Sequence, residues 1–212
     1  MLEGMAPRWY SRLDESPDGL FYATPRFVTH IDDAAIAAVT QLYREYFPPG
    51  GAILDLMSSW ISHLPAEVVY GRVVGLGMNR DELAANPRLH AWVVQDLNET
   101  PRLPWDNAEF DAAGICVSVD YLTRPVEVLR DCGRVLRPGA PLVITFSNRC
   151  FPSKVIAAWR MLDDQGHQAL VARYLTEAGN WTEMETLDRS PTPDSDPLYA
   201  VIARRTQNAC CS

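Results

Sequence analysis

Short apolar runs alternate along most of this chain with segments in which apolar residues recur at helical spacing. The apolar runs fall at residues 52–56, 72–76, 91–94, 110–119 and 142–146. Little polar alternation interrupts them, which is typical of strands buried on both faces of a parallel sheet. The pattern therefore predicts an α/β fold in which helices cover both faces of a mostly parallel sheet.

The helical segments have recognisable beginnings and ends. Asp32 and Asp33 predict a helix start, because carboxylates are favoured at the positive end of a helix dipole. The Pro-Pro-Gly-Gly of residues 48–51 ends that helix. Residues 65–70 are expected to be a short helical or irregular piece. Further helices are predicted over residues 80–85, 125–136, about 153–162 and about 165–178.

Two strand-like runs, residues 181–187 and 198–203, close the chain. The connection between them is too short for a helical crossover, so we expect an antiparallel hairpin at one edge of the sheet. Residues 1–30 carry aromatic side chains among turn formers and cannot build their own core. We expect them to form an arm or lid over the main domain at residues 31–206, with residues 207–212 as a flexible tail.

Composition narrows the possible partners. The chain has 212 residues, 47% of them hydrophobic, which is enough for one domain with a sizeable core. Its net charge is −8, whereas binding to phosphate backbones or anionic membrane surfaces requires clustered Lys and Arg. We therefore expect no nucleic-acid and no membrane partner. No apolar run reaches the roughly 20 residues of a membrane-spanning helix, and no secretory signal is recognisable.

Five cysteines are an odd number without the spacing of a disulfide framework, which favours reduced thiols and a cytoplasmic location. Cys210 and Cys211, together with Cys116 or Cys150, could bind a thiophilic metal or metalloid. Nothing in their spacing completes a four-ligand zinc site. We expect the terminal pair to be incidental and the protein to hold no metal.

Three motifs occur in order across the centre of the chain. They are Val-Val-Gln-Asp-Leu-Asn at 93–98, Leu-Pro-Trp-Asp-Asn-Ala-Glu-Phe-Asp at 103–111 and Arg-Val-Leu-Arg-Pro-Gly at 134–139. With these motifs, the span from about 52 to 203 resembles class I, Rossmann-like S-adenosylmethionine-dependent methyltransferases of the small-molecule type. The resemblance implies a three-layer Rossmann-like sandwich, S-adenosylmethionine as cofactor, and direct methyl transfer to a small-molecule substrate.

The resemblance places the amino-acid end of the cofactor at the turn after the first strand. Asp55 matches the acid that supports this turn, but the glycines usual in such a loop are absent from residues 57–61, Met-Ser-Ser-Trp-Ile. Serine hydroxyls could replace some of the loop's backbone donors. The contacts expected from this turn are Asp55, Met57, Ser58 and Ser59.

The remaining cofactor contacts fall on the turns after the next three strands. The acid that would accept hydrogen bonds from both ribose hydroxyls falls on Gly77, and the amide oxygen of Asn79 is a weaker substitute. Asp96 matches the position that contacts the adenine amino group. The contacts expected from these turns are Gly77, Met78, Asn79, Asp96, Leu97 and Val117.

Tyr121 and His30 are the catalytic candidates. Tyr121 follows the fourth strand, where the family places groups near the transferred methyl, and it or Asp120 could orient or deprotonate an acceptor. His30 precedes the first long helix and could act as a base near neutral pH. Each could instead be a packing residue, and His167 is expected on a solvent face.

Arg26, Trp60, Asn148 and Arg149 are the substrate-binding candidates. Asn148 and Arg149 follow the fifth strand and could clamp a carboxylate or phosphate, although a helix-capping turn is the alternative. Arg26 belongs to the predicted arm, and Trp60 to the loop after the first strand.

A second hypothesis of another class remains open: a methyltransferase-like module that has lost its chemistry and binds a partner. The missing glycines and the missing ribose acid favour it, and it predicts a crevice filled by Met57 and Trp60. A Rossmann-like site for a different nucleotide ranks last, because the strand-two acid is also absent. The methyl acceptor and the oligomeric state stay open.

Overall fold

The computed structural model describes residues 6–207, which form a sheet of seven strands in the order β3-β2-β1-β4-β5-β7-β6. The strands are β1 Ala52–Leu56, β2 Arg72–Gly77, β3 Ala91–Val94, β4 Ala112–Cys116, β5 Pro141–Phe146, β6 Trp181–Asp188 and β7 Tyr199–Arg205. The first five are parallel, while β7 runs antiparallel between β5 and β6. The predicted α/β sandwich with an antiparallel C-terminal hairpin is confirmed.

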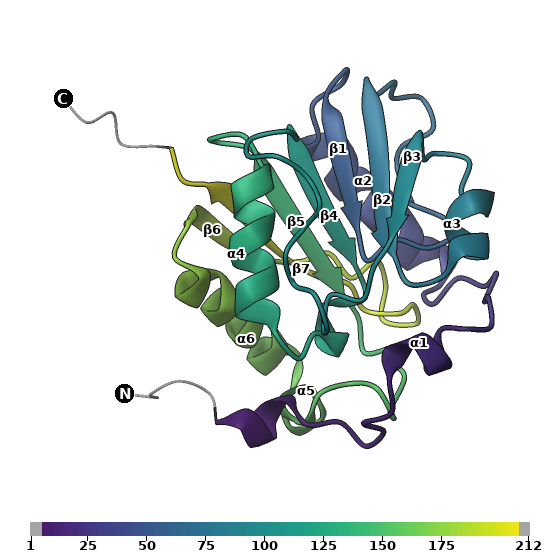
Figure 1. Ribbon diagram of the computed structural model, residues 1–212, viewed down its shortest axis with the longest axis vertical. Coiled ribbons are helices and arrows are strands. Elements are labelled where there is room, and N and C mark those ends of the chain that lie inside the picture. The colour runs from purple at the N-terminus through teal and green to yellow at the C-terminus, as the bar shows by residue number, and fades with distance from the viewer. Residues whose placement is uncertain (1–5, 208–212) are drawn as a thin grey trace.

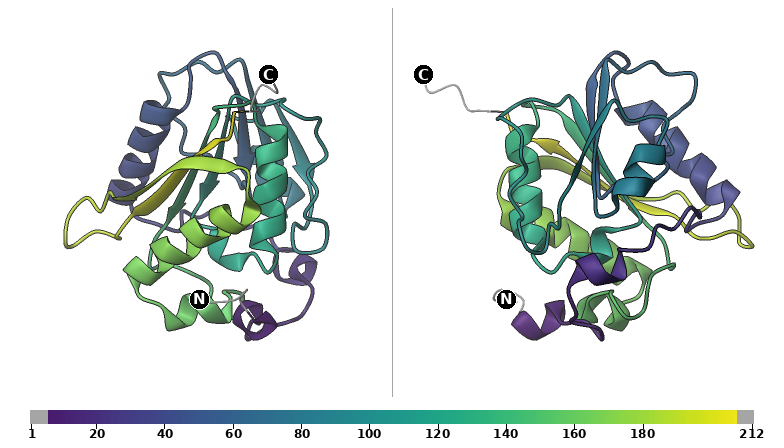
Figure 2. Two further views of the ribbon diagram at one scale, coloured as in Figure 1. Left: turned by 90° about the vertical axis from the view of Figure 1, so that its left-hand side faces the viewer. Right: turned by 45° about the vertical axis from the view of Figure 1, so that its right-hand side comes forward.

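Helices lie on both faces of this sheet (Figures 1 and 2). The helices of the described residues are η1 Pro7–Tyr10, α1 Asp18–Phe21, α2 Asp33–Tyr46, α3 Arg80–Ala85, η2 Val119–Tyr121, α4 Pro125–Val135, α5 Ala157–Met161 and α6 Asp164–Ala178. Successive strand residues point to opposite faces. Leu54 and Leu56 accordingly join the core beneath α4 and α6, whereas Ile53 joins the core beneath α2.

Most helix ends agree with the sequence signals. Asp32 caps α2, because its side chain accepts a hydrogen bond from the Ala35 backbone, and Pro125 opens α4. The predicted helix over 153–162 is wrong in its first part, since α5 begins only at Ala157. The reason is that the backbone amides of Ile156 and Ala157 donate to Asp120 and Ser11, outside any helix.

Two further differences affect the edge of the sheet that carries the site. The strand predicted over 110–119 ends at Cys116, because Val117 adopts a left-handed φ of 42° before η2 begins. Residues 57–71, between β1 and β2, contain no helix, so the irregular alternative for 65–70 is the correct one. A long loop therefore lies at the end of β1 in place of a short glycine turn.

The predicted arm runs along the carboxyl ends of the parallel strands (Figure 1, purple). Its backbone is joined to the domain at two points: the Asp14 backbone amide donates to the Ser153 carbonyl, and the Asn79 side-chain amide donates to the Tyr22 carbonyl at 2.8 Å. The predicted tail, with Cys210 and Cys211, lies outside the described residues apart from position 207.

A buried cluster of charges holds the middle of the arm. Lys154, the chain's one lysine, is 0% exposed, and its Nζ lies 3.1 Å from Asp14 Oδ2 and 3.2 Å from Asp18 Oδ1. Arg12 Nη1 lies 2.6 and 2.7 Å from the two oxygens of Asp18. We call these four residues, Arg12, Asp14, Asp18 and Lys154, the arm latch.

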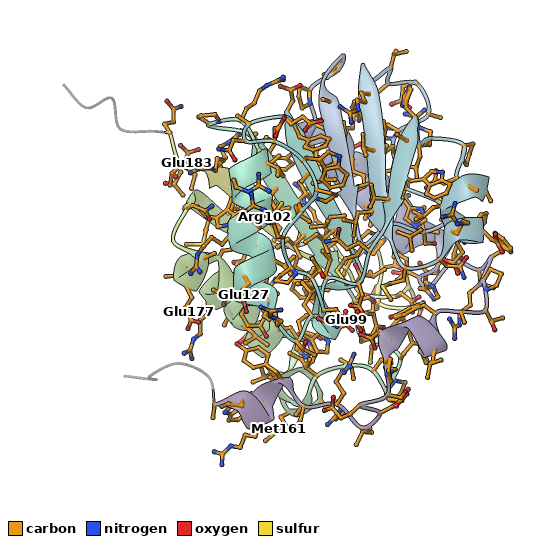
Figure 3. The ribbon with its side chains drawn as sticks, viewed as in Figure 1. Glu99, Arg102, Glu127, Met161, Glu177 and Glu183 are labelled. Carbon is orange, nitrogen blue, oxygen red and sulfur yellow. The ribbon has the colours of Figure 1, made fainter. Side chains whose placement is uncertain are left out.

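The outer surface carries many acidic side chains, among them Glu127 on α4 and Glu177 on α6 (Figure 3). Across residues 6–207, no helix has the length and the hydropathy needed to cross a membrane. Nor do three or more His, Cys, Asp or Glu side chains of this part of the chain gather into an arrangement that would hold a metal ion.

Candidate active site

A cavity of about 390 Å³ lies between the arm and the carboxyl ends of the parallel strands. Ligand pockets in proteins span ~300–1,000 Å³, and this edge of an open parallel sheet is where ligands bind in such folds. Its walls come from the arm and from the turns after β1, β2, β3, β4 and β5. The topology thus brings together residues that are far apart in the sequence.

Most of the candidate residues line this cavity. They are Arg26, His30, Asp55, Met57, Ser58, Ser59, Gly77, Met78, Asn79, Asp96, Leu97, Val117, Tyr121 and Arg149. Trp60 and Asn148 are not among the lining residues.

Trp60 instead holds the arm. Its indole Nε1 donates to the Val28 carbonyl at 3.0 Å, and its ring packs edge-on against Phe27 with centroids 6.3 Å apart. The indole therefore faces the arm rather than the cavity. Asn148 is exposed at the turn after β5. The geometry does not support the substrate-binding role predicted for these two residues.

A serine network replaces the glycine loop after β1. Asp55 Oδ2 accepts hydrogen bonds from Ser58 Oγ and Ser62 Oγ, both at 2.6 Å. The Asn86 amide donates to Ser62 Oγ at 2.8 Å and to the Ser59 carbonyl at 2.9 Å. Burial raises the pKa of Asp55 to about 6, although the serine hydroxyls pull it down. The loop is held by side chains, and Asp55 is its centre.

The same loop explains why β2 ends in glycine. The Ser58 amide donates to the Leu76 carbonyl at 2.7 Å, so the loop crosses the end of β2. A Cβ at Gly77 would overlap the Ser58 carbonyl oxygen. An acid at this position is therefore sterically excluded by the loop that replaces the glycine turn.

We expect Gly77→Ala to lower the free energy of unfolding by about 1–3 kcal/mol, because the clash is with backbone that cannot rotate away. Urea denaturation of the variant and the wild type measures this. Gly19→Ala is the matched control, because a Cβ there has no atom within 4 Å. Equal stability of the Gly77 and Gly19 variants would contradict the loop geometry.

Asn79 does not offer its amide oxygen to a ligand, contrary to the sequence expectation. Its Oδ1 accepts hydrogen bonds from the Asp81 and Glu82 backbone amides at 2.9 and 3.1 Å, which caps α3. Its Nδ2 donates to the Tyr22 carbonyl of the arm. The side chain links α3 to the arm, and both of its ends are used.

The side chains of the turn after β3 are arranged as expected for binding a nucleobase. Asp96 Oδ1 accepts the Asn98 backbone amide at 2.8 Å, which fixes the carboxylate, and no hydrogen bond from residues 6–207 reaches Oδ2. Leu97 beside it is 4% exposed and gives an apolar wall. One fixed carboxylate oxygen beside an apolar surface suits a planar ring with an amino group.

The two catalytic candidates differ in protonation. Tyr121 is 8% exposed, its Oη accepts the Phe151 amide at 2.8 Å, and burial raises its pKa, so the phenol stays protonated at neutral pH. His30 is exposed and packs edge-on against Phe151 with centroids 5.3 Å apart. Loss of water around the ring and the nearby Arg26 lower its pKa against the opposing effect of Glu82, which favours a neutral, basic imidazole.

The two arginines of the cavity are not equivalent. Arg149 Nε lies 2.6 Å from Asp196 Oδ1, so its charge is already paired. Arg26 has no carboxylate at ion-pair distance within residues 6–207. Its guanidinium lies 4.5 Å from the ring centroid of Phe21 and 5.5 Å from that of Phe151. Arg26 is therefore the cation available to an anionic group in the cavity.

Sequence reasoning missed several lining residues, including Glu82, His63, Cys150 and Phe151. In the sequence, Glu82 is recognisable only as an acid in the first turn of a helix. Such acids are common and indicate no particular function. His63 lies in the loop between β1 and β2, and burial lowers its pKa to about 4, so it is neutral at pH 7.

A family model described as a methyltransferase domain matches residues 58–144. No curated protein matches the chain. Among solved structures, a putative methyltransferase from Haloferax volcanii in complex with the Trm112 methyltransferase activator has a TM-score of 0.60 at 15% identity, over 82% of this chain and 91% of that one. The [4+2]-cyclase SpnF has a TM-score of 0.60 at 16% identity, over 89% and 91%.

An S-adenosylmethionine-dependent methyltransferase from Mesorhizobium loti has a TM-score of 0.56 at 17% identity, over 79% of this chain and 98% of that one. At these identities the solved structures show the fold, and the family match adds a methyltransferase domain. The family match supports the cofactor predicted from the sequence, S-adenosylmethionine. The class I part of the resemblance seen in the motifs is confirmed: the chain has the class I, Rossmann-like fold of S-adenosylmethionine-dependent methyltransferases and carries a methyltransferase domain match over residues 58–144.

Proposed function

We propose that this protein is an S-adenosylmethionine-dependent methyltransferase that transfers a methyl group directly to a small-molecule acceptor. The observation that carries the proposal is the cavity of about 390 Å³ beneath the arm, at the sheet edge where the predicted cofactor residues converge. This volume is within the range of pockets that hold one small ligand.

The residues present fit the two ends of the cofactor. Asp96 and Leu97 would hold the adenine, and the loop from Met57 to Ser59 would hold the amino-acid end. Only the ribose contact usual at the end of β2 is absent, because the Ser58 carbonyl occupies that position beside Gly77.

When bound, S-adenosylmethionine supplies an electrophilic methyl group on a sulfonium sulfur. The protein's part is to position the acceptor, since alignment of the two reactants lowers most of the barrier. Arg26 would bind an anionic group of the acceptor, Tyr121 would form the wall beside it, and His30 would take the proton that the acceptor loses. The arm would exclude water.

The alternative, an inactive partner-binding module, has two observations in its favour. The Ser58 carbonyl blocks the ordinary ribose position, and the Haloferax volcanii neighbour is itself in a complex with a protein activator. Against it, the cavity is not filled: Met57 lines it, and Trp60 points to the arm. The catalytic proposal therefore ranks first.

Calorimetric titration with S-adenosylmethionine and S-adenosylhomocysteine tests the proposal. We expect micromolar binding of both, and about 10- to 100-fold weaker binding by Asp96→Ala, because the adenine amino group loses its hydrogen-bond acceptor. Glu99→Ala is the matched control, since this exposed neighbour does not line the cavity. No binding at millimolar ligand would favour the inactive module, and equal affinity of the Asp96 variant would remove the adenine assignment.

The cytoplasm remains the proposed location. Cys116, Cys132 and Cys150 are free in the structure, which agrees with a reducing compartment.

A further inference from the structure

Four acidic side chains line the cavity: Asp18, Asp55, Glu82 and Asp96. Asp18 has no capacity left for a ligand. Both of its oxygens lie against Arg12, Lys154 adds a second cation, and the Asn98 amide donates to Oδ2 at 2.9 Å. Asp18 belongs to the arm latch.

Asp55 and Asp96 are placed by their own turns. Asp55 holds the serine network beneath the loop after β1. Asp96 lies in the turn after β3. In the same turn, the side-chain amide of Gln95 donates to the Thr100 and Arg102 carbonyls at 2.7 and 2.9 Å. Gln95 does lie beside the end of β2, where its backbone amide donates to the Gly77 carbonyl, but its side chain is already used within its own turn.

Glu82 is the remaining acid, and it lies on the element that follows β2 directly. It occupies the first turn of α3, five positions after Gly77, and is 9% exposed. Its Oε1 accepts the Arg26 backbone amide at 2.6 Å. Within residues 6–207, no hydrogen bond reaches Oε2 and no cation pairs with the carboxylate. A carboxylate buried to this degree with one hydrogen bond has acceptor capacity to spare.

We propose that Glu82 accepts hydrogen bonds from the ribose hydroxyls of the cofactor, in place of an acid at the end of β2. The inference rests on the proposed function, because it requires an adenosine-containing ligand in this cavity. The loop after β1 removes the ordinary position at Gly77 by steric exclusion, and the Asn79 amide is used in capping α3. The carboxylate that binds the ribose would thus lie on the first turn of α3 and not at the end of β2.

This placement gives Glu82 a second contact that an acid at the end of a strand would lack. The same carboxylate holds the arm through the Arg26 amide, and Arg26 carries the unpaired cation of the cavity. A ribose bound to Glu82 therefore shares its acceptor with the arm. Cofactor binding and the position of Arg26 are coupled through one side chain.

The test is a thermodynamic cycle in which Glu82→Gln and the wild type are titrated with S-adenosylhomocysteine and with its 2′,3′-dideoxy analogue. We expect Glu82→Gln to bind S-adenosylhomocysteine about 10- to 100-fold more weakly than the wild type. The dideoxy analogue should bind both proteins with equal, reduced affinity. Gln keeps an oxygen for the Arg26 amide, and Asp81→Asn, an exposed neighbour on α3, is the matched control.

Two outcomes overturn the assignment while the proposed function stands. Either Glu82→Gln binds S-adenosylhomocysteine as the wild type does, or it weakens both ligands by the same factor, which would mean that Glu82 acts only through the arm. If the wild type binds neither ligand, the inference and the proposed function fail together.

Discussion

Asp18→Asn is expected to release the arm from the sheet edge. The substitution keeps the size of the side chain but leaves the buried cations Arg12 and Lys154 facing a neutral amide. Removing one partner of a buried ion pair costs about 3–5 kcal/mol. The arm can escape that cost by undocking, because water then reaches Lys154. We therefore expect local opening of residues 12–30 rather than global unfolding.

Lys154 makes this opening directly measurable. It is the chain's only lysine and is 0% exposed, so a lysine-specific protease has one internal site, which is covered in the closed state. The Asp18 variant should be cut at Lys154 at least tenfold faster than the wild type, a factor that corresponds to about 1.4 kcal/mol of opening free energy. The far-ultraviolet circular dichroism of the uncut protein should not change.

Glu15→Gln is the matched control. Glu15 lies on the same arm and 3.6 Å from Arg12 Nε, but its side chain is 60% exposed, and such pairs contribute ~0–1 kcal/mol. If the Asp18 and Glu15 variants are cut at the same rate, the buried charges do not hold the arm. Cleavage that accelerates only together with loss of circular dichroism would mean global unfolding.

The fold could be predicted from the sequence because its signals are local. A strand buried on both faces needs an unbroken apolar run, and residues 52–56 and 91–94 were placed with the bounds that the structure has. The antiparallel hairpin followed from the length of its connection alone. Family-like motifs then indicated the Rossmann-like class of the fold.

Side-chain contacts between distant segments could not be predicted in the same way. His167 was expected on a solvent face, but it is 7% exposed, stacks on Trp159 with centroids 4.0 Å apart, and its Nε2 lies 2.8 Å from the Trp159 carbonyl. Its position in α6 gave no sign of this, because α5 supplies the partner. Lys154 is a similar case, since its partners lie about 140 positions earlier.

The site residues also divide into those that the sequence predicts and those that only the structure explains. Asp55 and Asp96 were found because each directly follows a strand, where position alone brings a side chain to the cavity. The reason for Gly77 required the structure, because the clash involves a carbonyl of another turn. Glu82 was missed for the same reason: its neighbourhood is made by the arm.

Asp120 is a buried carboxyl group with no charged partner among the described residues. It is 3% exposed, and its Oδ2 has no hydrogen-bond partner among the described residues. Burial raises its pKa to about 8, against the lowering effect of its own backbone amide and of Tyr121. The groups around it are Tyr22 of the arm, Tyr121, Cys150 and Tyr174, none of them a cation.

The sign of its contribution to stability follows from proton counting. An unfolded aspartate loses its proton near pH 4, whereas the folded protein keeps it to about pH 8. Between these values the folded state holds one proton more than the unfolded state. Asp120 therefore makes wild-type stability fall as pH rises, by up to about 1.4 kcal/mol per pH unit. Above the folded pKa the slope ends.

Asp120→Asn is expected to remove this slope, because the amide is neutral at every pH and has nearly the same volume. Relative to the wild type, the variant should gain about 4 kcal/mol in free energy of unfolding between pH 5 and pH 8. Urea denaturation at four pH values measures the difference, and the slope stays readable even if the amide adds a constant cost. Asp194→Asn is the control, since Asp194 is exposed. Curves that run parallel for wild type and Asp120→Asn would mean that Asp120 is ionised in the folded protein, and a buried cationic or hydrogen-bonding partner would then have to face its Oδ2.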